Sequence, residues 1–75
     1  MDAYVLILTE VGTGSKVGVA VGKVAGVSES HLVTGPYDVI ARVEGKDMNA
    51  LSKLVDEVQK IPGVTRTLTC PILRL

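Results

Sequence analysis

Apolar side chains recur at three- and four-residue intervals through the second half of the chain, which predicts an amphipathic α-helix. The residues of this stripe are Met48, Leu51, Leu54, Val55, Val58 and Ile61. Asp47 precedes the stripe and is a candidate N-cap, while Pro62-Gly63 follows it as a stop signal. We therefore expect a helix that begins after Asp47 and ends near Ile61.

The segment from Ser15 to Val24 fits either a strand or a helix, because its valines alternate with small residues and also recur at helical spacing. A faint internal repeat favours the helix: residues 23–28 (KVAGVS) are echoed by residues 60–65 (KIPGVT). Each copy is typical of the end of a helix followed by the start of a strand. The basic residue suits the helix C-terminus, and the glycine suits the left-handed conformation that ends the helix. Gly18 and Gly22 each cost a helix about 1 kcal/mol relative to Ala, so this helix needs close packing against a neighbour.

Strands are expected at about residues 3–10, 27–34, 37–44 and 64–73, which gives the order βαββαβ within one domain spanning residues 1–75. This is the ferredoxin-like α+β plan. Right-handed crossovers place both helices on one face of a four-stranded antiparallel sheet and leave the other face bare.

The bare face is predicted to be partly apolar. In the first strand Val5 and Ile7 point one way, and the opposite set, Tyr4, Leu6 and Leu8, is apolar too. A sheet with one solvated face should instead alternate apolar with polar residues. A chain of 75 residues is also near the size at which one core barely stabilises a fold. We expect a homodimer that buries this face, with a tolerated patch on a monomer as the alternative.

Charge and cysteine content exclude several classes of protein. Eight basic and eight acidic residues leave no net charge, and the basic ones are scattered, which argues against direct nucleic-acid binding. No apolar run is long enough to span a bilayer, and we expect a cytoplasmic protein. Cys70 is the single cysteine, so one chain forms neither a disulfide nor a thiolate metal site, and we expect a buried thiol.

The turn from Thr34 to Asp38 is the predicted ligand contact. Gly35 is free to adopt a positive φ, Pro36 fixes the next φ, and Asp38 is suited to folding back onto turn amides. Tyr37 adds one of only two aromatic side chains in the chain. These residues alone fit a structural hairpin as well as a binding loop.

Other motifs carry weaker chemical signals, and we expect no catalytic residue, metal or cofactor. The clusters at residues 12–14 and 18–24 lack the spacing of a dinucleotide fingerprint or a P-loop, so a plain strand-to-helix loop is expected at residues 11–14. His31 and Glu29 share a strand face, which fits a polar strand edge better than an acid/base pair.

In the last strand Thr65, Thr67 and Thr69 are predicted to share one face, with Arg66 on the other. A threonine ladder is good β-structure, and beside a shaped turn its hydroxyls also suit the charged ends of an amino acid. Arg66 suits either a bidentate carboxylate contact or a salt bridge, and the salt bridge is favoured.

Three segments together resemble the effector-binding domain of the Lrp/AsnC family of transcriptional regulators. They are Gly26-Val27, residues 34–40 (TGPYDVI) and residues 61–69 (IPGVTRTLT). The resemblance covers nearly the whole chain. Because no helix-turn-helix segment accompanies it, the chain most resembles the stand-alone RAM (regulation of amino acid metabolism) module.

The resemblance implies a non-enzymatic module of the dimeric αβ-barrel type that senses an amino acid or related metabolite. Family dimers form through their sheets and assemble into rings, often octameric, with ligands between dimers. The implied contacts are Thr34, Gly35, Pro36, Tyr37 and Asp38 first, then Thr65, Thr67 and Thr69. Output on transcription or metabolism would pass through a partner such as a full-length regulator of the family.

Two alternatives remain at this point. One is a small cofactor-free enzyme of the dimeric αβ-barrel type, which needs His31 inside an enclosed pocket. The other is an ACT-like regulatory domain, which shares the strand order but binds its ligand near the first loop, here residues 11–14.

Overall fold

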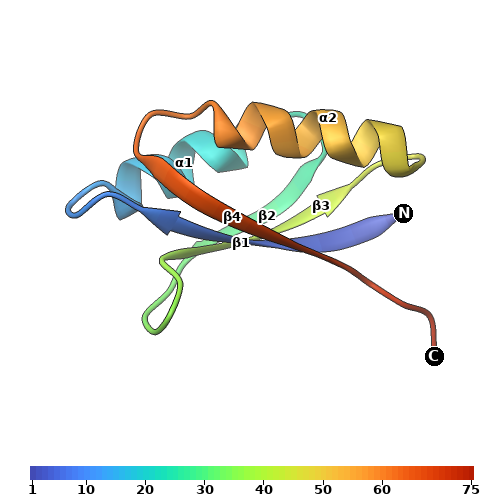
Figure 1. The fold of residues 1–75 in the computed structure, drawn as a ribbon, viewed down its shortest axis with the longest axis horizontal. Coiled ribbons are helices and arrows are strands. Elements are labelled where there is room, and N and C mark those ends of the chain that lie inside the picture. Colours follow the sequence, from blue (N-terminus) through green and yellow to red (C-terminus); the bar gives the residue numbers. More distant parts are fainter.

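The predicted βαββαβ order is confirmed in a computed structural model that describes all residues 1–75 (Figure 1). The elements are β1 (Asp2–Thr9), α1 (Gly14–Gly22), β2 (Val27–Leu32), β3 (Val39–Glu44), α2 (Met48–Gln59) and β4 (Val64–Pro71). The strands form one sheet in the order β2-β3-β1-β4, and each neighbouring pair is antiparallel. Asp47 caps α2 as predicted, because its Oδ1 accepts the Ala50 N–H at 2.9 Å.

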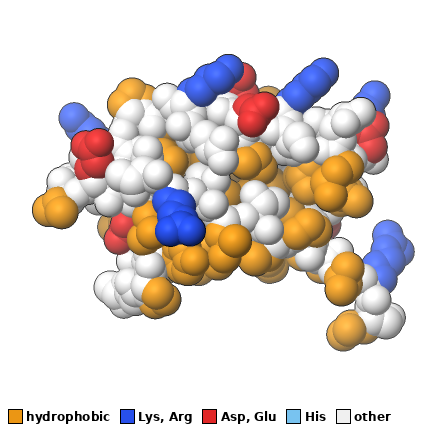
Figure 2. All heavy atoms as spheres, viewed as in Figure 1, with side chains coloured by type: hydrophobic (Ala, Val, Ile, Leu, Met, Phe, Trp, Pro, Cys, Tyr) orange, Lys and Arg blue, Asp and Glu red, His pale blue; other side chains and the backbone are white.

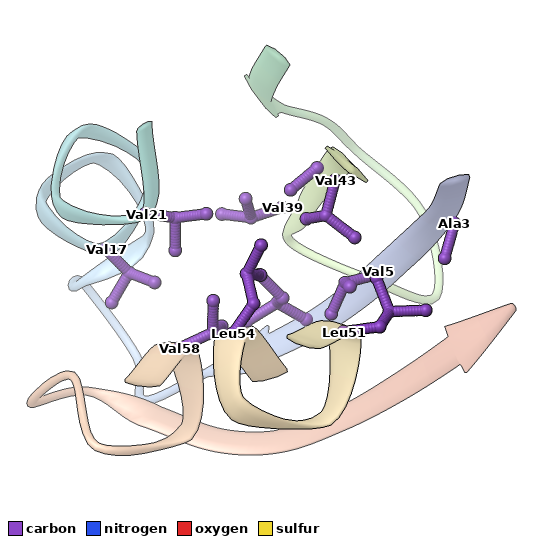
Figure 3. Close-up of a cluster of buried hydrophobic side chains, with 11 residues drawn as sticks. Ala3, Val5, Val17, Val21, Val39, Val43, Leu51, Leu54 and Val58 are labelled. Atoms are coloured by element: carbon purple, nitrogen blue, oxygen red, sulfur yellow. The ribbon is translucent and has the colours of Figure 1, made fainter. Parts of the chain in front are cut away.

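Both helices cover the same face of the sheet and bury a core made of aliphatic side chains. Figure 3 shows these side chains pointing toward one another from α1, α2, β1 and β3. The buried residues are Ala3, Val5, Ile7, Val17, Val21, Val39, Ala41, Val43, Leu51, Leu54 and Val58. The stripe predicted on α2 therefore faces the core at Leu51, Leu54 and Val58, whereas Met48 at its start is 53% exposed.

The internal repeat marks two equivalent turns. Gly26 follows α1 with a φ of 95°, and Gly63 follows α2 with a φ of 99°, so both glycines make the left-handed exit expected from the sequence. Gly26 also lies against α2: a Cβ there would overlap Leu54 Cδ1 and lie 3.0 Å from the Glu44 carbonyl oxygen. This glycine is required both by its conformation and by its close packing.

Helix α1 packs against β2 beside its two internal glycines, but a Cβ at Gly18 or Gly22 would make only ordinary contacts, at 3.8 Å and 3.6 Å. Ser30 donates its hydroxyl to the Gly18 carbonyl at 2.7 Å, and a Cβ on Gly22 would lie 3.6 Å from the Ser30 Cβ. The burial of Val17 and Val21 against the sheet therefore offsets the low helix propensity of this segment.

The opposite face of the sheet is bare in the single chain. Figure 2 shows apolar side chains gathered on the side away from the helices, while most charged side chains lie along the helical layer. Leu6 pairs with both Ile40 and Leu68, which makes an apolar row across the middle of this face. Tyr4 is 42% exposed and Leu68 is 47% exposed. We refer to this surface, which also carries Leu8, as the bare face.

The prediction of a buried Cys70 thiol is wrong for the single chain, because the side chain is exposed. Cys70 pairs with Tyr4 on β1 and so belongs to the bare face, which no helix covers. Neither helix has the length and apolar composition needed to cross a membrane.

Replacing Gly26 with Ala should lower the free energy of unfolding by about 2–4 kcal/mol. The left-handed conformation costs an L-residue about 1–2 kcal/mol, and the added methyl group overpacks the contact with Leu54. Gly35→Ala is the matched control, because Gly35 also has a positive φ of 126° but its Cβ would meet nothing within 4 Å. Urea denaturation at one protein concentration measures both variants. Equal losses would contradict the packing role of Gly26.

Candidate functional site

The turn between β2 and β3 is fixed by its aspartate. Asp38 Oδ2 accepts the Thr9 backbone N–H at 2.8 Å and the Thr9 hydroxyl at 3.0 Å. The Asp38 N–H donates to the Ile7 carbonyl, and the Val33 N–H donates to the Asp38 carbonyl, each at 2.9 Å. The carboxylate therefore anchors the turn to the end of β1, and the prediction that it would fold back onto the turn amides is wrong. Charge-assisted bonds of this kind are the stronger hydrogen bonds in proteins.

The tip of the turn presents unpaired backbone donors. Thr34, Gly35 and Tyr37 donate no backbone N–H hydrogen bond within the chain, and Pro36 has no N–H. Gly35 adopts the expected positive φ of 126°. Thr34, Gly35 and Pro36 are exposed, and Figure 1 shows the turn extending to the side of the sheet away from the helices. Three N–H groups are thus free to bind an acceptor.

Tyr37 lines a cavity of about 290 Å³ at the edge of the bare face. Its other lining residues are Leu8, Arg66, Thr67 and Leu68. Leu8 and Arg66 are paired across β1 and β4, so their side chains share the bare face. The cavity combines an apolar floor, one aromatic wall and one cation.

The threonines lie on the other side of the sheet. Thr67 and Thr69 pair with Ile7 and Val5, whose side chains are in the core, so both threonines face the helical layer. Gln59 of α2 donates to the Thr67 hydroxyl at 2.8 Å. Thr69 lines a groove of about 330 Å³ between α2 and β4. Thr65 is exposed and lies where the pairing of β1 with β4 shifts register, so it is separated from this pair.

Two charged pairs occupy the bare face away from the cavity. Arg42 donates to Asp2 at 2.8 Å and to the Tyr4 hydroxyl at 3.4 Å. The hydrogen bond to Tyr4, helped by the charge of Asp2, raises the pKa of Arg42 further above its ordinary value. His31 Nε2 lies 3.1 Å from Glu29 Oε1, so the two side chains do share a face, as predicted.

The environment of His31 does not meet the requirement of the enzyme alternative. Its side chain is 62% exposed, and the only side chain that it contacts by a hydrogen bond is the equally open Glu29. General acid/base catalysis needs an oriented group next to a substrate site. No group of three His, Cys, Asp or Glu side chains lies close enough to hold a metal ion.

Thr9 is the residue of this region that the sequence analysis missed. It is 29 positions from Asp38, and nothing in its local sequence distinguishes it from any threonine at a strand end. Its role depends on β1 lying beside β3, which brings the end of β1 to the turn. Only the assembled sheet reveals the contact.

Replacing Asp38 with Ala should destabilise the fold by about 2–3 kcal/mol while leaving it formed, because two hydrogen bonds to a carboxylate are lost. Thr9→Val removes only the hydroxyl bond and should cost about 1 kcal/mol. Hydrogen exchange should show that the amide of Thr9 exchanges faster in Asp38→Ala than in wild type. In Thr9→Val, the exchange rate of the amide at position 9 should change no more than the rates in the rest of the chain. Unchanged exchange in Asp38→Ala would show that the carboxylate does not hold the turn.

Comparison with known proteins identifies the family. The family model described as "Lrp/AsnC ligand binding domain" matches residues 2–75. The HTH-type transcriptional regulator FL11 from Pyrococcus horikoshii is 30% identical over 74 residues, which are 99% of this chain and 49% of FL11. The homocitrate synthase of Sulfurisphaera tokodaii is 35% identical over 51 residues, which are 68% of this chain and 11% of that enzyme. The chain thus spans about half of the regulator and about a tenth of the enzyme.

The fold agrees with this assignment. The crystal structure of TTHA0845 from Thermus thermophilus superimposes with a TM-score of 0.92 at 35% identity, covering 99% of this chain and 94% of that one. The matches to FL11 and to TTHA0845 each cover 99% of this chain, and the match to the enzyme is confined to a small part of its length. The chain belongs to the Lrp/AsnC family of ligand-binding domains.

Proposed function

We propose that the chain binds a free amino acid, or a closely related metabolite, at a subunit interface built around the turn from Thr34 to Asp38. The observation that carries this proposal is the set of three unpaired N–H groups on a turn that the Asp38–Thr9 contact holds in shape. Successive backbone donors in a turn form a concave site for an anion such as a carboxylate. Because the turn is fixed before the ligand arrives, little ordering entropy opposes binding.

The position of the threonines supports a site shared between subunits. Thr67 lines the Tyr37 cavity of its own chain, whereas Thr69 lines the separate groove beside α2 on the helical side of the sheet. One small ligand does not reach both Tyr37 and Thr69 of the same chain. If both residues contact the ligand, Thr69 comes from a neighbouring subunit.

The size of the cavities supports the same conclusion. The Tyr37 cavity measures about 290 Å³ and the groove beside Thr69 about 330 Å³. Both lie at the small end of the volumes typical of ligand pockets. A second subunit placed over either opening would supply the missing walls.

The bare face is the proposed dimer interface. Its middle row of Leu6, Ile40 and Leu68 is apolar, and Leu68 remains 47% exposed in the single chain. Packing two such faces together would remove this apolar surface from water and form the dimeric αβ barrel. We propose that these dimers assemble further into a ring of the octameric kind.

The regulatory output is proposed to pass through a partner protein. Related segments occur in a helix-turn-helix regulator and in a biosynthetic enzyme, so the shared element is the ligand-binding domain and not a particular output. This chain has no net charge, which leaves it without the basic surface of a DNA-binding domain. A full-length regulator of the same family is a suitable partner, because both would present the same assembly surfaces.

The ACT-like alternative places the ligand at residues 11–14. In the structure this loop is a local turn in which Thr13 contacts the Glu10 carbonyl through both its N–H and its hydroxyl. We place the ligand at the turn from Thr34 to Asp38 instead, because that turn presents unpaired N–H groups beside a cavity.

Titration calorimetry of the protein against the twenty standard amino acids should detect binding of at least one of them. Light scattering on the same samples should show a mass of at least two chains, with a change in mass when the ligand prefers one oligomer. Binding is expected at the turn, so Asp38→Ala should abolish the heat, with circular dichroism confirming that the variant is folded. No heat from any amino acid, together with a monomeric mass, would refute the proposal.

Two inactive variants should restore binding when they share an oligomer. Asp38→Ala disrupts the turn, and Thr69→Val removes the hydroxyl that lies outside the Tyr37 cavity, so neither variant should bind alone. In an oligomer refolded from an equal mixture, about a quarter of the sites would combine an intact turn from one chain with an intact Thr69 from another. Calorimetry should therefore recover about that fraction of the wild-type stoichiometry. No recovery in mixed oligomers would mean that the site does not cross a subunit boundary.

A further inference from the structure

We propose that Arg66 binds the carboxylate of the ligand in the cavity beside Tyr37, and that the cavity selects an amino acid with an apolar side chain. This inference rests on the proposed function and adds the residue that recognises the acid group. The expected surface or intersubunit salt bridge of Arg66 is not made within the chain, where no carboxylate lies within 4 Å of it, so such a bridge would have to join two subunits.

The register of the sheet places Arg66 at the site. Arg66 pairs with Leu8, and Leu68 lies two residues further along β4 on the same face. All three line the cavity with Tyr37, which carries one of the unpaired N–H groups of the turn. Arg66 and one residue of the turn with an unpaired N–H, Tyr37, therefore line the same cavity.

The charge balance of the bare face singles out Arg66. Arg42 is paired with Asp2 at 2.8 Å, and Glu29 lies 3.1 Å from His31. Arg66 is the arginine of this face without a carboxylate within 4 Å, and the residues that line its cavity include no carboxylate. The guanidinium of Arg66 lies beside an apolar surface and has no counter-ion within the chain. Its charge is therefore stabilised either by water or by an anionic ligand.

The chemistry of the cavity defines the ligand class. A guanidinium fork binds a carboxylate through two parallel hydrogen bonds, which gives orientation as well as affinity. Leu8 and Leu68 offer an apolar surface for the ligand's side chain, and one cation matches one carboxylate. The geometry thus favours a monocarboxylic amino acid with an aliphatic side chain over a dicarboxylic one or an amine.

A competing role for Arg66 is an ion pair across the dimer, with Glu29 of a second copy as the acceptor. Both roles would leave Arg66 unpaired in the single chain. They differ in what the loss of the charge affects: the ion pair contributes to assembly, and the ligand contact contributes to discrimination between an acid and its amide. The mass of the oligomer and the preference for the acid over its amide are therefore measured together.

The experiment compares Arg66→Gln, Arg66→Lys and wild type in titrations with each of the twenty L-amino acids and its carboxamide. Wild type should bind its preferred acid at least about tenfold more tightly than the amide, because the amide lacks the charge. Arg66→Gln should lose this preference, Arg66→Lys should keep part of it, and both should retain the wild-type mass in light scattering. Arg74→Gln is the matched control, because Arg74 is exposed in the segment after β4 and outside the cavity.

The outcomes separate this inference from the proposed function. If wild type binds an amino acid and Arg66→Gln keeps the full preference for the acid, Arg66 is not the carboxylate contact and the proposed function stands. If Arg66→Gln forms a smaller oligomer than wild type in light scattering but still binds the acid more tightly than the amide, Arg66 is an interface residue and the inference is wrong. If wild type binds no amino acid, the proposed function fails and the inference fails with it.

Discussion

The structure depends on one constraint: the sheet has two apolar faces, and the chain supplies helices for only one of them. The first face is closed by α1 and α2 over a core of valine, leucine, isoleucine and alanine. The second face keeps a central apolar row, with Leu68 about half exposed, because 75 residues provide no third layer. Burying that row in a second copy would stabilise the fold and would also place the turn from Thr34 to Asp38 at the edge of an interface.

In the turn, the side chain of Asp38 holds the conformation, and the backbone N–H groups stay free for the proposed ligand. Asp38 uses a carboxylate oxygen to hold the end of β1, and in doing so it fixes the conformation of a segment whose N–H groups remain unpaired. A flexible loop would lose conformational entropy on binding, whereas this turn has already been ordered by folding. The residue that resembles a ligand contact in the sequence therefore acts as the support of the contact.

The fold followed from the sequence because its signals are local and periodic. The apolar stripe on α2 and the repeated glycine exits at Gly26 and Gly63 each depend on neighbouring residues. The site depends on contacts between distant segments, and these were harder to predict. The Thr9–Asp38 bond joins residues 29 positions apart, and the register shift near Thr65 breaks a ladder that strict alternation predicts. The exposure of Cys70 likewise reflects what covers its face and not its own sequence neighbours.

A site divided between subunits would couple ligand binding to assembly without any moving part inside the chain. If the turn and Thr69 meet only across an interface, the ligand contacts more of the protein in the assembled state than in the separated one. A ligand shifts an equilibrium only by its difference in affinity for the two states, and a tenfold difference corresponds to about 1.4 kcal/mol. A domain with a marginal interface would respond to an effect of that size. The same small module would then be able to regulate different outputs, because the signal is the state of assembly and the output belongs to whichever protein shares the interface.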